Sequence, residues 1–286
     1  MPSLIDIRRR IRSVKNTQQI TRAMKMVSAA KLRRAQDRVI AARPYAELLT
    51  KVLSNVAAAV AADEKLGQNP LLAQRPERRV LLALVTSDKG LAGAFNSNLI
   101  KGAQRFAEEH REAEVRFQLV GRKGRDFFRK RAAKVVSDHV NLAAKPVYGD
   151  MAAIAREAME LYRAEEIDAV YLVYNEFKSV ASQKLRLKRV LPVEIARQEN
   201  PIDYIYEQPP AEMLNELLPK YVEMTFFQAL LESAASEHAA RMMAMESATS
   251  NAGEMIDKLT LYMNRVRQAS ITKEIIEVVS GAAAAE

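Results

Sequence analysis

Residues 240–255 read ARMMAMESATSNAGEM, a stretch suited to a helix but with unusual side chains for the core of a globular domain. It contains four methionines, and small polar residues and a glycine stand where a core face should be apolar. Methionine fills irregular gaps because its side chain is unbranched and flexible. An ordinary globular core is the alternative, but too little apolar area remains for it beside Ser247, Thr249, Ser250 and Asn251. The stretch therefore predicts a narrow, partly polar partner elsewhere in the chain.

Composition limits what the chain can be. Its 286 residues, 49% hydrophobic and 28% charged, are typical of a folded protein with one large domain or two modest ones. Cysteine is absent, which excludes disulfides, thiolate metal sites and cysteine nucleophiles. No apolar run approaches the roughly 20 residues of a membrane span, and the N-terminus lacks the apolar core of a signal peptide. We expect a cytoplasmic protein, unless a partner holds it at a membrane.

The net charge lies entirely near the N-terminus. The chain carries +9, and residues 1–50 contain 12 Lys or Arg against the three acids Asp6, Asp37 and Glu47, which gives the same net charge. Such a segment predicts an acidic partner surface made of phosphate, lipid or acidic side chains. Nucleic acid stays an alternative, but the segment does not carry the set of aromatic side chains that stack on bases.

A heptad seam runs through the N-terminal segment. From position 4 to position 60, steps of three and four reach mostly apolar residues, and the polar exceptions cluster at Gln18, Thr21, Lys25 and Ser28. With Pro44 as the one possible kink, the pattern predicts a helix over residues 3–60, about 87 Å long. The apolar members of the seam are Leu4, Ile7, Ile11, Val14, Leu32, Ala35, Val39, Ala42, Ala46, Leu49, Leu53, Val56 and Val60.

The C-terminal segment has the same rhythm. From Tyr221 to Val266 the seam is mostly apolar, and afterwards it dissolves into polar residues. The pattern predicts a helix over residues 210–280, kinked or restarted at Pro219 and about 105 Å long. Two narrow stripes on long helices are buried most simply against each other. We therefore expect an antiparallel coiled coil of the two terminal helices.

The predicted register places Leu4 opposite Val266. Met242 and Met245 then face residues 24–28, the small and partly polar partner that the opening stretch requires. The difference in helix length leaves about 13 unpaired residues, or about 20 Å of lone helix. This overhang falls near residues 267–281.

The middle of the chain alternates between strand and helix patterns, which predicts a small α/β domain with a partly parallel sheet. The expected division is therefore residues 1–60 as the N-terminal coiled-coil helix, 61–209 as the α/β domain with its linkers, and 210–286 as the C-terminal helix and tip. Strands are predicted at 78–87, 115–121, 134–140, 168–177 and 184–193, and helices at 96–110, 122–131 and 150–166.

Signals for chemistry are weak. The turn TSDKGLAGAFNSN at 86–98 and the stretch GRKGRDFF at 121–128 could present a phosphate site, but neither matches an established phosphate-binding motif. The three histidines, His110, His139 and His238, have no second ligand at helical spacing, so no metal site is expected. No cofactor site and no catalytic set are predicted. A phosphate-using enzyme dependent on Lys89 and Gly90 remains an alternative.

Long stretches resemble the gamma subunits of F-type ATP synthases. They are residues 11–36 (IRSVKNTQQITRAMKMVSAAKLRRAQ), 87–96 (SDKGLAGAFN), 235–253 (ASEHAARMMAMESATSNAG) and 264–282 (NRVRQASITKEIIEVVSGA). The resemblance covers nearly the whole chain. It implies a non-catalytic rotor whose terminal helices form a central shaft inside a hexameric collar of alpha and beta subunits. The α/β domain would stand on the ring of c subunits, beside epsilon.

The resemblance also assigns contacts. It implies that Arg22, Met24 and Lys25 meet the acidic lever loop of beta, and that a second group meets the beta catch loop: Arg267, Gln268 and Thr272. A third group is expected against the c ring or epsilon: Tyr204, Tyr206 and Glu207. Rotation of the shaft would couple proton flow to ATP synthesis at the beta subunits.

One family feature is absent, because the regulatory cysteine insert of the chloroplast branch has no counterpart in this sequence. The chain also shows no transit peptide. We therefore expect a bacterial protein, peripheral on the cytoplasmic face of the inner membrane, and no thiol control of rotation.

Overall fold

The computed structural model describes residues 3–60, 69–131, 133–195 and 206–283. Their contacts divide the chain into two compact units. We call Met1–Ser28 together with Met242–Glu286 the helical unit, and Ala29–Arg241 the sheet unit.

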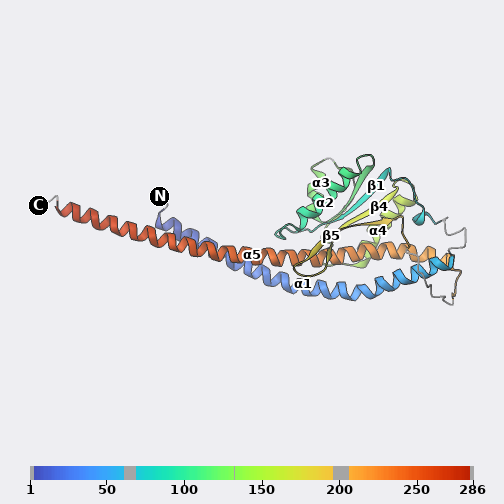
Figure 1. The fold of residues 1–286 in the computed structure, drawn as a ribbon, viewed down its shortest axis with the longest axis horizontal. Helices are drawn as coiled ribbons and strands as arrows, with labels where there is room; N and C mark the ends of the chain where they lie inside the picture. Colours follow the sequence, from blue (N-terminus) through green and yellow to red (C-terminus); the bar gives the residue numbers. More distant parts are fainter. Residues whose placement is uncertain (1–2, 61–68, 132, 196–205, 284–286) are drawn as a thin grey trace. The chain divides into compact units, whose positions relative to one another are not determined.

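Two long helices dominate the secondary structure. Helix α1 spans Leu4–Val60 and helix α5 spans Pro210–Ala283, close to the predicted bounds (Figure 1). Pro44 and Pro219 lie inside these helices, so the predicted alternative of a restart at Pro219 is wrong. Ser3 caps the start of α1, since its hydroxyl accepts from the Asp6 backbone N–H and donates to the Asp6 carboxylate.

Burial in the helical unit follows the predicted seam. The buried residues of α1 in this unit are Ile7, Thr21 and Ser28, and all three are members of the seam. The buried residues of α5 in the same unit are Met245 and Ala252, which also belong to the predicted series. The seam is therefore confirmed for this part of the coiled coil, with polar residues among its buried members.

Burial of α1 in the sheet unit follows the seam and then widens. The buried seam residues there are Leu32, Val39, Leu49, Leu53, Val56 and Val60. Near the end of the helix, Ser54, Asn55 and Ala57 are buried as well, although they lie off the seam. Ala57 joins the same apolar cluster as Leu53 and Val56, so the helix presents a broader buried face where it meets the α/β core.

The sheet unit contains a five-stranded sheet in the order β3-β2-β1-β4-β5. Strands β1 to β4 pair in parallel, and β5 pairs with β4 in the antiparallel direction. The predicted α/β domain is therefore confirmed. Its elements are η2 (Pro70–Leu72), β1 (Arg79–Val85), α2 (Phe95–Glu109), β2 (Glu114–Val120), α3 (Arg122–Arg129), β3 (Val135–His139), α4 (Tyr148–Arg163), β4 (Ala169–Phe177) and β5 (Gln183–Leu191).

Both faces of the sheet are covered by helices, which explains why β1 is apolar after its first residue. Leu81 and Val85 of β1 pack in a cluster with α4, α5 and the end of α1. Leu82 and Leu84 point to the opposite face and pack with α2 and α3. Strand β5 lies at the edge and is mostly polar, which fits its single neighbour in the sheet.

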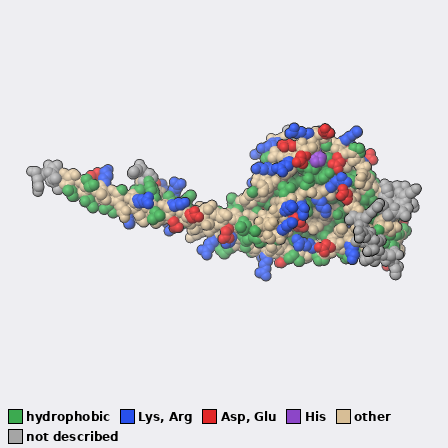
Figure 2. Space-filling model, viewed as in Figure 1, with side chains coloured by type: hydrophobic (Ala, Val, Ile, Leu, Met, Phe, Trp, Pro, Cys, Tyr) green, Lys and Arg blue, Asp and Glu red, His purple; other side chains and the backbone are tan. Residues whose placement is uncertain are grey.

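The surface of the sheet unit is rich in basic side chains, and Figure 2 shows many Lys and Arg residues on its visible face. Acidic side chains are interspersed among them in the same view. In the part of the chain that the structure describes, no helix combines the length and the apolar character needed to cross a membrane.

Candidate interaction sites

The two terminal helices meet through polar contacts in the helical unit. The hydroxyl oxygens of Thr21 and Thr249 lie 2.8 Å apart, and the Gln18 side-chain amide donates to the Thr249 carbonyl over 3.3 Å. Lys25 forms an ion pair with Glu246. Because the helices are antiparallel, Thr21 opposite Thr249 is the same register as the predicted Leu4 opposite Val266. The predicted register is confirmed at this point.

These contacts explain the composition of ARMMAMESATSNAGEM. Met245 and Ala252 are buried on the seam, and Thr249 supplies the hydroxyl between them. A Cβ atom at Gly253 would lie 3.2 Å from the Gln18 amide nitrogen, so the glycine allows a close approach there. The partner is narrow and partly polar, as the sequence predicts.

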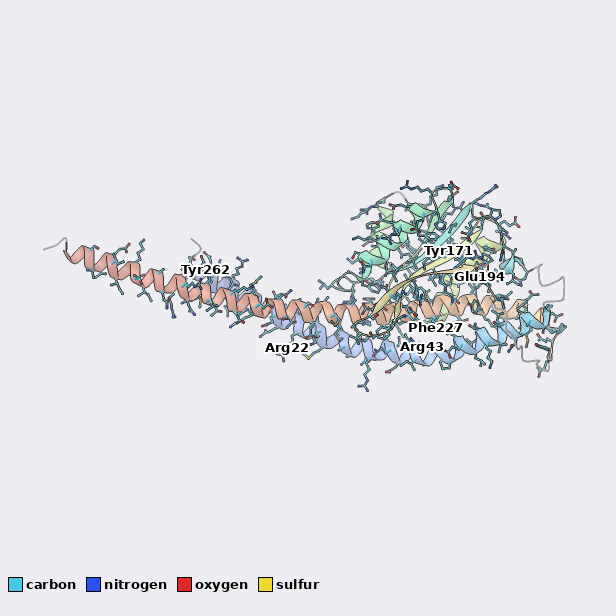
Figure 3. The ribbon with its side chains drawn as sticks, in the orientation of Figure 1. Arg22, Arg43, Tyr171, Glu194, Phe227 and Tyr262 are labelled. Atoms are coloured by element: carbon cyan, nitrogen blue, oxygen red, sulfur yellow. The ribbon has the colours of Figure 1, made fainter. Side chains whose placement is uncertain are left out.

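The residues expected at the beta lever loop occupy different environments. Arg22 is exposed, and Met24 and Lys25 are half-buried. Figure 3 labels Arg22 on α1. Lys25 forms an ion pair with Glu246, a partner that the sequence analysis did not name. In contrast, no carboxylate among the described residues forms an ion pair with Arg22. Arg22 and Lys25 both line an open hollow of about 540 Å³.

The tip of α5 has no partner within the described chain. Residues 271–280 are all exposed, and Figure 1 shows α5 continuing past the start of α1 in the helical unit. Arg267, Gln268 and Thr272 are exposed, and the Thr272 hydroxyl donates to the Gln268 carbonyl over 2.9 Å. Large apolar side chains are exposed beside them: Ile271, Ile275, Ile276, Val278 and Val279.

The expected foot contacts are only partly described. Tyr204 lies outside the described residues. Tyr206 is partly buried and packs against the core cluster of the sheet unit, while Glu207 is exposed. Glu207 therefore offers the more accessible side chain of the two.

The turn after β1 uses its polar groups internally. Asn96 accepts from the Ser87 backbone N–H over 3.0 Å, and the Asp88 carboxylate accepts from the backbone N–H groups of Arg122 and Asn141. Asp88 thus ties the loops after β1, β2 and β3 together. These polar groups of TSDKGLAGAFNSN therefore hold the surrounding loops in place.

The histidines have structural surroundings. The His110 ring stacks on Phe106 with the ring centroids 4.0 Å apart, and His238 contacts Arg241. Burial, followed by the charges of Arg241 and Lys31, lowers the pKa of His238 to about 4. Within the described ranges, no three His, Asp or Glu side chains gather as metal ligands would.

Long antiparallel helices with an exposed tip, together with an α/β domain, are the features of a stalk protein that acts through contacts. Residues 3–285 match the family model described as ATP synthase. The chain is 76% identical over 286 residues to the ATP synthase gamma chain of Solibacter usitatus (strain Ellin6076), with 100% of each chain covered. It is 53% identical over 289 residues to that of Anaeromyxobacter sp. (strain Fw109-5), with 99% of each covered. The chain belongs to the ATP synthase gamma chain family.

Solved structures agree with this membership. The central stalk and c ring of the Tetrahymena thermophila mitochondrial ATP synthase gives a TM-score of 0.63 at 29% identity, covering 80% of this chain and 99% of that chain. A Euglena gracilis mitochondrial ATP synthase chain gives 0.69 at 20% identity, covering 98% and 94%, which supports the fold alone. Gamma chains are stalk subunits, so this chain is a non-catalytic coupling subunit.

Proposed function

We propose that this chain is the rotating central shaft of a bacterial F-type ATP synthase, at the cytoplasmic face of the inner membrane. The shaft turns inside a collar of alpha and beta subunits, while the α/β domain contacts epsilon and the c ring. Proton-driven rotation thereby changes the conformation of the beta catalytic sites, because each site meets a different side of the shaft. The observation that carries the proposal is the exposed tip of α5, whose apolar side chains have no partner within the described chain.

Three groups of residues make the proposed contacts. Arg22, Met24 and Lys25 meet the beta lever loop, where the exposed Arg22 provides the most available charge. Arg267, Gln268 and Thr272 meet the beta catch loop, and a guanidinium suits a carboxylate there because it donates two parallel hydrogen bonds. The third group meets the c ring or epsilon: Tyr204, Tyr206 and Glu207.

The catch-loop contact is tested in the assembled complex. Arg267→Ala should lower ATP-driven proton pumping in membrane vesicles, because the proposed ion pair between Arg267 and the catch loop loses one member. Loss of one member of a buried charge pair weakens a contact by about tenfold or more. Lys273→Ala is the matched control, since Lys273 is exposed and forms an ion pair with Glu277 within α5. Equal pumping by the two variants would remove Arg267 from the proposed contact.

The role of the tip is tested by truncation. Removing residues 267–286 should weaken coupling or assembly of the complex while the isolated chain keeps its helical unit folded. A truncated chain that assembles and couples normally would refute the proposed role of the tip.

A further inference from the structure

A basic cavity of about 210 Å³ lies within the sheet unit. Three cations of α1 line one side, Lys31, Arg34 and Arg38, and their spacing places them on one face of the helix. Lys89 from the loop after β1 and Asn141 from the loop after β3 line it as well.

The position of the cavity is typical of a ligand site. Its loops follow β1 and β3, so they lie at the carboxyl edge of the parallel strands. Strand β1 lies between β2 and β4, where the strand order reverses direction. Open α/β sheets bind ligands in the crevice at this edge.

The cavity has an excess of positive charge, because five cations line it (Lys31, Arg34, Arg38, Lys89 and Arg241) against the two carboxylates of Asp88 and Glu237. Glu237 pairs with Arg241 at 2.6 Å, and both side chains are buried. Asp88 accepts from the backbone N–H groups of Arg122 and Asn141. Among the described residues, no carboxylate lies within ion-pair distance of the cations Lys31, Arg34, Arg38 and Lys89. These four side chains are exposed and line one hollow, and with Arg241 they outnumber the two carboxylates of the lining by three charges.

The lining is held in place by hydrogen bonds. Arg241 donates to the Gly90 carbonyl over 3.2 Å and to the Lys89 carbonyl over 3.4 Å, which fixes the backbone that carries Lys89. Arg241 also contacts Nδ1 of His238 at 3.4 Å. An arginine N–H can only donate, so Nδ1 accepts and Nε2 carries the proton. His238 thus adds a neutral N–H donor to the lining.

We propose that this cavity binds a small doubly charged anion of the inorganic phosphate type. Cations from α1 and from the loop after β1 would share the anion and join the helix to the sheet loops. A cavity of about 210 Å³ is smaller than the roughly 300–1,000 Å³ of ordinary small-molecule sites, which favours phosphate over a nucleotide. The proposal does not depend on the contacts proposed for the rotor.

The test is a calorimetric titration of the full chain with inorganic phosphate. Potassium chloride at equal ionic strength serves as the control titrant. Saturable binding to one site is expected. Arg34→Ala should weaken it by about tenfold or more, since a charge-assisted hydrogen bond is lost. The matched control is Arg33→Ala, because Arg33 is exposed and does not line the cavity.

Thermal unfolding provides a second measurement. Phosphate should raise the melting temperature of the parent chain and of Arg33→Ala, and should raise that of Arg34→Ala less, because only the folded state binds it. Absence of saturable binding, or equal weakening in both variants, would overturn the proposal. Tighter binding of ADP or of an acidic peptide than of phosphate would also overturn it, in favour of a nucleotide or a protein partner.

Discussion

A disulfide between the terminal helices tests the register of the coiled coil. The hydroxyl oxygens of Thr21 and Thr249 lie 2.8 Å apart, and the chain contains no cysteine that could compete. Sulfur atoms in place of these oxygens, on longer bonds to Cβ, would approach the S–S bond length of about 2.05 Å. Thr21→Cys combined with Thr249→Cys should therefore form an intramolecular disulfide on mild oxidation.

The expected gain in stability follows from the loop that the disulfide closes. The two positions are 228 residues apart, and the chain-entropy model gives about 5 kcal/mol for such a loop as an upper bound. Urea unfolding of the oxidised and reduced protein, followed by circular dichroism, measures the difference. The shift in electrophoretic mobility without reductant shows whether the bond is intramolecular.

The matched control moves each cysteine by two residues, to Ala23→Cys with Asn251→Cys, where both side chains are exposed. Residues two positions apart on a helix point in different directions, so this pair should crosslink poorly. Equal crosslinking of the two pairs, or a disulfide at 21 and 249 that forms only between molecules, would refute the register. In the assembled complex the correct crosslink should leave ATP synthesis intact, because both helices belong to the same rotor.

Two further predictions concern single residues. Gly253→Ala should raise the free energy of unfolding in urea by up to about 1 kcal/mol, because alanine favours the helix and the Gln18 amide can move away. Gly121→Ala should instead lower it. Gly121 has φ +97°, and the added Cβ would lie 2.2 Å from the Thr86 carbonyl oxygen. Between pH 6.5 and 4 the unfolded chain binds a proton at His238 and the folded chain does not, so acidification should lower the free energy of unfolding of the parent chain by up to about 3 kcal/mol. His238→Asn should abolish this decrease. The same pH profile for parent and variant in urea unfolding would contradict the prediction.

The helices and strands could be predicted from the sequence because their patterns are long. The seam of α1 and the apolar run of β1 repeat over many residues, so single exceptions do not hide them. The cavity was not predictable, because Lys31, Lys89 and Arg241 become neighbours only through the tertiary fold. The ion pair of Lys25 with Glu246 could have been found, since the predicted register already placed the two residues close together.

The tip of α5 combines two kinds of surface that suit different tasks. Ile275 and Val278 are exposed and their side chains cannot form hydrogen bonds, so an apolar surface inside the collar could contact them without fixing one orientation of the shaft. Arg267 and Gln268 carry directional donors, which would favour particular orientations of the shaft. A rotor requires both properties, because it must turn freely between positions and still distinguish among them. The combination of polar and apolar side chains on the exposed tip is therefore what we expect of a shaft that turns and also presents a different surface to each site it passes.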